Sequence, residues 1–104
     1  MNTTMAWQEI LSLCDEVEAL LRDAAPVADD ARLRRIGFLC TRMQGRDPYI
    51  SEKAGNLASR AGMYLSARKH ATCPGGADGL MQDMRYSLLS AIREQAQWLQ
   101  RSEK

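Results

Sequence analysis

The chain has 104 residues, of which 45% are apolar and 26% are charged. This composition is typical of a folded protein, and the length suits one domain over residues 1–104 rather than two. The 14 Lys and Arg residues nearly balance the 13 Asp and Glu residues, so net charge alone favours neither nucleic acid nor a membrane as partner. No apolar run approaches the roughly 20 residues of a membrane span, and the start of the chain lacks a signal-peptide layout. We therefore expect a soluble, cytoplasmic protein.

Proline and glycine residues, which end helices, interrupt the chain at three places. These places lie near residues 25–30, 45–48 and 72–79. The alternation of β-branched and aromatic residues that marks strands is missing. The pattern predicts an all-α protein with four helices, at about 5–25, 29–44, 48–70 and 78–100.

Apolar residues recur every three or four positions in each predicted helix, which places them on one stripe. Helices of this length with short connections favour an antiparallel up-and-down four-helix bundle. That topology brings the start of the first helix beside the end of the fourth. We therefore expect Trp7 and Trp98 to share one end of the core.

The fourth predicted helix carries more apolar surface than one stripe. Tyr86, Leu89 and Ala96 form a second stripe beside the first. A helix on the surface of a bundle needs only one apolar face, so this helix is expected either to be central or to face a second subunit. We predict a homodimer whose interface includes Tyr86, Leu89 and Arg93.

The sequence contains no recognisable catalytic set. Cys14 and Cys40 lie on predicted core stripes and are expected to be buried thiols. Cys73 follows His70, the last residue of the third predicted helix, by three positions, but a closed zinc site needs four ligands. We expect no enzymatic activity, no cofactor and no metal site. A small enzyme that uses Cys73 and His70 is the remaining alternative.

Charge is distributed unevenly along the chain. Residues 1–30 have a net charge of −6, whereas residues 31–70 have a net charge of +7. In one interpretation the acidic first helix pairs with the basic helices at the surface. In the other, the basic face of the second and third helices binds an acidic protein surface or nucleic acid.

Phe38 lies roughly 200° around its helix from the core residue Ile36 and is therefore expected at the surface, among arginines. Aromatic residues and arginines are frequent in protein interfaces. The sequence thus predicts a non-catalytic interaction protein: an adaptor, a chaperone-like protein, or an inhibitor or immunity-type protein. The alternative is a nucleic-acid-binding regulator that uses the same arginine-rich face. The predicted partner-binding residues are Arg34, Arg35, Phe38, Arg42, Lys53 and Arg60.

Overall fold

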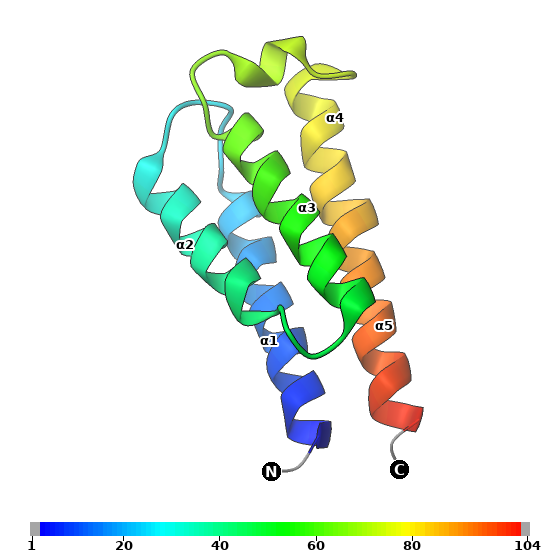
Figure 1. Ribbon diagram of the computed structural model, residues 1–104. Coiled ribbons are helices and arrows are strands. Elements are labelled where there is room, and N and C mark those ends of the chain that lie inside the picture. Colours follow the sequence, from blue (N-terminus) through cyan, green and yellow to red (C-terminus); the bar gives the residue numbers. More distant parts are fainter. Residues whose placement is uncertain (1–2, 103–104) are drawn as a thin grey trace.

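A computed structural model describes residues 3–102 of the chain, which form four antiparallel helical rods and no strand (Figure 1). The predicted all-α, up-and-down four-helix bundle is confirmed. Three rods are single α-helices, and the fourth is assembled from two α-helices around a π-helix. The elements are α1 (Thr3–Arg22), α2 (Asp30–Arg42), α3 (Pro48–Tyr64), the 3₁₀ helix η1 (Lys69–Thr72), α4 (Gly76–Gln82), the π-helix η2 (Asp83–Leu88) and α5 (Leu89–Ser102).

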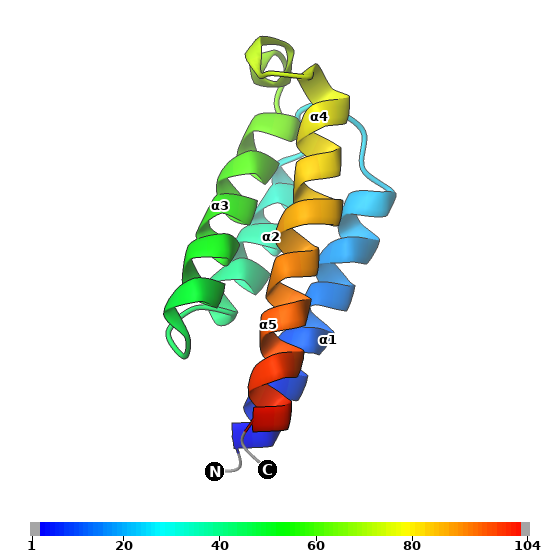
Figure 2. The same cartoon turned by 90° about the vertical axis from the view of Figure 1, so that its right-hand side faces the viewer.

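Each rod packs against the rods that precede and follow it in the chain, and the first rod also packs against the fourth. α1 packs against α2 and α5, and α3 packs against the same two helices. Figure 2 shows α1 and α5 side by side along their lengths, with both chain ends at the same end of the bundle. In both views these two helices extend past the loop between α2 and α3.

Aspartate side chains cap the starts of α2 and α3. The carboxylate of Asp29 accepts a hydrogen bond from the backbone N–H of Arg32 at 3.1 Å. Asp47 accepts one from Ile50 at 3.0 Å, and Pro48 occupies the first turn of α3. The Asp-Pro start at residues 47–48 is therefore as predicted, because a capping oxygen and a fixed proline φ both favour helix initiation there.

The predicted end of the third helix is wrong by six residues. The helix ends at Tyr64 rather than at residue 70, and a 3₁₀ turn follows. The hydroxyl of Ser66 donates a hydrogen bond to the carbonyl of Met63 and accepts one from the N–H of Lys69 at 3.0 Å. These side-chain bonds replace helical backbone bonds. His70 consequently lies in η1 and not at the end of α3.

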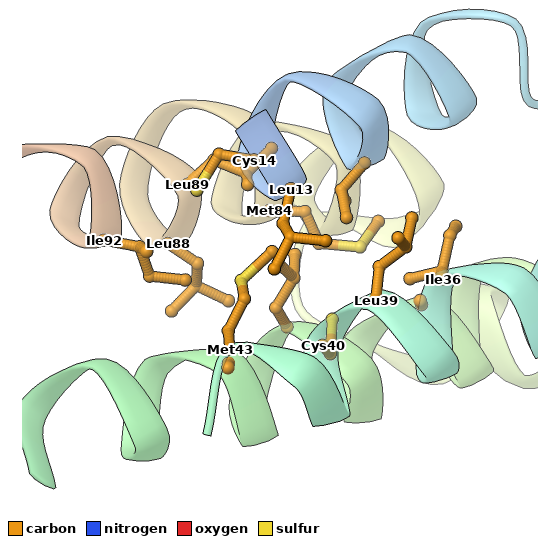
Figure 3. Packing of buried hydrophobic residues seen from close by; sticks show 14 of the residues in the cluster. Leu13, Cys14, Ile36, Leu39, Cys40, Met43, Met84, Leu88, Leu89 and Ile92 are labelled. Atoms are coloured by element: carbon orange, nitrogen blue, oxygen red, sulfur yellow. The ribbon is translucent and has the colours of Figure 1, made fainter. Parts of the chain in front are cut away.

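The core fills the space between the four rods. Figure 3 shows Leu13, Met43, Met84 and Leu88 pointing into this space from three of them. Trp7 is buried, as predicted, but Trp98 is 54% exposed, which corrects the expectation that both tryptophans share the core. Trp98 lies four residues before the end of α5, and that end of the helix extends beyond the loop between α2 and α3 (Figure 1).

The π-helix η2 accounts for part of the surplus apolar surface of the fourth rod. A π-turn takes up one extra residue, so the following helix is rotated back by about 100° relative to an unbroken α-helix. Leu89, at the start of α5, is thereby turned into the same core as Leu88 and has no exposed surface. The prediction that Leu89 belongs to a homodimer interface is therefore wrong, because its own chain buries it.

Candidate interaction surface

Two ion pairs join α1 to α2 along their shared edge. The guanidinium of Arg35 donates from Nε to the carboxylate of Glu16 at 3.0 Å, and Arg42 pairs with Glu9. Both arginines and both glutamates are seven residues apart, two turns of helix, so the pairs align in the antiparallel arrangement. The interpretation that acidic and basic helices pair within the chain is therefore correct for these two arginines.

Phe38 lies between these two arginines on the outer side of α2. Its side chain is 52% exposed, so its predicted position off the core is confirmed. The guanidinium carbons of Arg35 and Arg42 lie 5.4 and 5.9 Å from the centre of its ring. Both distances are within the range of cation–π attraction. We call Phe38, Arg35, Arg42, Glu9 and Glu16 the Phe38 cluster.

The six predicted partner-binding residues contact different neighbours within the chain. Arg34 neighbours the Phe38 cluster, is exposed, and forms no ion pair within the described part of the chain. Arg60 instead pairs with Asp83 of η2, on another side of the bundle. Lys53, two turns before Arg60 on α3, lies 5.1 Å from the ring centre of Tyr49. The side chains on α2 and α3 thus have different neighbours, and a common basic face on the two helices stays a prediction.

Of the three residues predicted for a homodimer interface, only Tyr86 has a largely exposed side chain. It is 65% exposed, with the guanidinium carbon of Arg85 at 5.3 Å from the ring centre. Arg93 is bound within the chain, to Asp15 at 3.1 Å and to Glu18 at 3.5 Å. The acidic residues of α1 are thus neutralised from α2 on one side and from the fourth rod on the other.

The three cysteines are free thiols in two different environments. Cys14 and Cys40 are buried, as predicted, whereas Cys73 is partly exposed. Burial in the apolar core raises the pKa of Cys14 and that of Cys40 from 9.0 to about 12, because the core disfavours the charged thiolate.

We expect one fast-reacting thiol in the native protein and three after unfolding, because the thiolate is the reactive form and Cys14 and Cys40 remain protonated and inaccessible. Titration with a chromogenic disulfide at pH 8, with and without denaturant, measures both numbers. Three fast thiols in the native state would contradict the burial of Cys14 and Cys40.

The unfolded chain loses these two thiol protons near pH 9.0 but the folded chain only near pH 12. The free energy of unfolding should therefore fall as pH rises between these values.

A cavity of about 330 Å³ lies between the end of α3, the following loop and the start of the fourth rod. Its wall is mostly apolar, with one ion pair, and is formed by Arg60, Met63, Cys73, Pro74, Gly79, Leu80 and Asp83. Sequence analysis missed this cavity. In the sequence, only Cys73 in the loop pointed to this region. The opposite wall of the cavity comes from α3, and its position depends on where that helix ends.

Among the described residues, no group of three or more His, Cys, Asp or Glu side chains is placed to hold a metal ion. None of the helices in residues 3–102 combines the length and apolar character needed to cross a bilayer. Comparison with protein-family models, with curated proteins and with solved structures gave no match.

Proposed function

We propose that this protein is a non-catalytic protein-interaction module, and that it binds its partner through the Phe38 cluster and the adjoining Arg34. The observation that carries the proposal is a half-exposed aromatic ring held between two guanidinium groups that are themselves held by carboxylates. Adaptor, chaperone-like and inhibitor or immunity-type roles are all compatible with such a surface.

The restricted conformations of these side chains in the free protein support this proposal. Long arginine side chains lose conformational entropy when a partner immobilises them. Here Glu16 and Glu9 already fix Arg35 and Arg42, and both guanidiniums border Phe38. Part of the entropic cost of binding is therefore met in the free protein, which is a property expected of an interface hot spot.

The chemistry of the cluster indicates the kind of partner. The exposed ring of Phe38 favours contact with an apolar side chain on the partner. A guanidinium has five N–H donors, and Arg35 uses only two of its groups on Glu16, so it can still bind a partner carboxylate or carbonyl. Arg34, one helical turn before Phe38 on α2, adds a positive charge that pairs with no carboxylate in the described part of the chain. The partner surface we propose is therefore an apolar patch bordered by acidic residues.

Replacing Phe38 by alanine should weaken partner binding by about 2 kcal/mol or more, roughly 30-fold, as for interface hot spots. The matched control is Tyr86→Ala, which removes another exposed aromatic ring next to an arginine on a different side. The partner is first captured with the wild-type chain from its source cells and then titrated with both variants by calorimetry. Equal affinities for the wild type and Phe38→Ala would contradict the proposal.

Nucleic-acid binding through the arginines is a weaker proposal. Phosphate binding depends on unneutralised positive charge and falls steeply with salt. Arg35, Arg42 and Arg60 each pair with a carboxylate of the same chain. Retention on heparin at low salt, lost on substitution of Arg34 and Arg35, would favour this function over a protein partner.

The homodimer stays a prediction that now depends mainly on Tyr86, since Leu89 is buried and Arg93 is paired within the chain. Light scattering measures it directly, because a single chain has a mass of 11.6 kDa. A cytoplasmic location is also proposed, and the three cysteines, all free thiols, fit a reducing compartment.

A further inference from the structure

The cavity at the end of α3 has walls that the backbone holds in place. On one side, the loop through Pro74 lies directly against the start of the fourth rod, because a Cβ at Gly79 would be only 2.7 Å from the carbonyl oxygen of Pro74. Gly75, with a φ of 79°, takes up the left-handed conformation that turns the chain into α4. On the other side, Met63 belongs to α3. The cavity is therefore formed in the free chain, as most ligand sites are.

A buried leucine and an ion pair give the cavity an apolar end and a polar end. Leu80 is only 6% exposed, whereas the side chains of Arg60 and Asp83 are 38% and 37% exposed. The apolar wall thus lies deep and the ion pair lies at the mouth. A concave, mostly apolar site with a few converging polar groups is the usual form of a small-molecule site. The ligand that fits it is amphipathic, with its apolar part inside.

The ion pair leaves hydrogen-bonding groups of both kinds free. The Nε atom of Arg60 approaches the Oδ2 atom of Asp83. Among residues 3–102, no group forms a hydrogen bond with the two Nη groups of Arg60 or with Oδ1 of Asp83. The mouth of the cavity thus offers donors beside an acceptor, and the pair has no net charge.

A carboxamide is the complement of this pair. Its carbonyl oxygen can accept a hydrogen bond from Arg60 while its N–H donates one to Asp83. A carboxylate in the same place would face Asp83 with a like charge, and an ammonium group would face Arg60 with a like charge. The ion pair therefore favours a neutral head group that both donates and accepts.

A π-helix begins at the same point of the fourth rod. Asp83 is the first residue of η2, and Leu80 precedes it in α4. There the backbone directs Asp83 to Arg60 while the next residue, Met84, is fully buried in the core. π-turns are rare and occur frequently at functional sites. The unusual backbone and the polar end of the cavity thus coincide.

We propose that this cavity binds a small amphipathic carboxamide, a function beyond the protein interaction proposed above. The carboxamide is held between Arg60 and Asp83, and its apolar chain lies against Met63, Pro74 and Leu80. The cavity volume of about 330 Å³ suits about ten non-hydrogen atoms, at roughly the 30 Å³ that one water molecule occupies in the liquid. Octanamide is a probe of this size.

The test uses Cys73, which lines the cavity, as a reporter. Bound octanamide should slow the reaction of this thiol with a chromogenic disulfide, with half-protection at about 1 mM or below. Octanoate and octylammonium have the same chain with a charged head group, and each should need at least about tenfold more. Arg60→Leu and Asp83→Leu should each raise the octanamide midpoint about tenfold.

Arg42→Leu is the matched control, because it removes an arginine that pairs with a glutamate elsewhere on the surface. This variant and Phe38→Ala should have the wild-type midpoint, so the result is independent of the Phe38 cluster. Circular dichroism shows that each variant is folded. The proposal is overturned if octanamide does not protect Cys73, if octanoate or octylammonium protects it at lower concentration, or if Arg60→Leu keeps the wild-type midpoint.

Discussion

Replacing Leu89 by alanine is expected to lower the free energy of unfolding by about 2–5 kcal/mol, the range for a buried leucine. Leu89 has no exposed surface and contributes to the core formed by all four rods. Because domains of this size lose about 4–8 °C of melting temperature per kcal/mol, the midpoint should fall by at least about 8 °C. Chemical denaturation followed by circular dichroism measures the effect.

The control for Leu89→Ala is Tyr86→Ala, three residues earlier on the same rod. Tyr86 is 65% exposed, so this variant should change stability by less than about 1 kcal/mol. The loss in Leu89→Ala should also be the same at all protein concentrations, because the contacts are within one chain. A loss that grows on dilution would show instead that Leu89 stabilises a dimer.

Deletion of Ser59 is expected to be far more destabilising than deletion of Ser87, although both residues are exposed. Without Ser59, the end of α3 rotates by about 100°, which takes Ala61 and Tyr64 out of the core. We expect a loss of about 3–5 kcal/mol, as for removal of a buried aromatic side chain.

Deletion of Ser87 should instead convert the π-helix into an α-helix. Relative to Met84, the core residues Leu88, Leu89, Ile92 and Ala96 would then follow at three, four, seven and eleven positions, which is one α-helical stripe. Stability should stay within about 1 kcal/mol of the wild type. If deletion of Ser87 were as damaging as deletion of Ser59, η2 would not be accommodating an extra residue as described.

Local signals in the sequence were sufficient for most of the fold. The Asp47-Pro48 start depends on a cap and a fixed φ within four residues, so it could be predicted without knowing the rest of the chain. The end of α3 could not, because residues 65–70 have ordinary helix propensity and the turn depends on the bonds of one serine, Ser66. Likewise, tertiary packing stabilises the π-helix, because its extra residue lets both halves of the fourth rod face the same core.

The candidate surface was predictable only in part. Phe38 could be placed outside the core from helical spacing alone. Which arginines lie beside it could not be predicted, because that depends on which helices are neighbours. Arg35 and Arg42 face α1 and its glutamates, while Arg60 faces Asp83 of the fourth rod. A list of basic residues in the sequence cannot separate these two groups.

The most direct test of Phe38 as the recognition residue is cross-linking in the source cells with a photoreactive phenylalanine analogue. The analogue is placed at position 38 or, as the matched exposed aromatic site, at position 86. Illumination should join the chain to a different protein from position 38, whereas position 86 should give at most a cross-link to a second copy of this chain. If position 38 yields only the unreacted 11.6 kDa chain while position 86 captures a protein, the Phe38 cluster is not the binding surface.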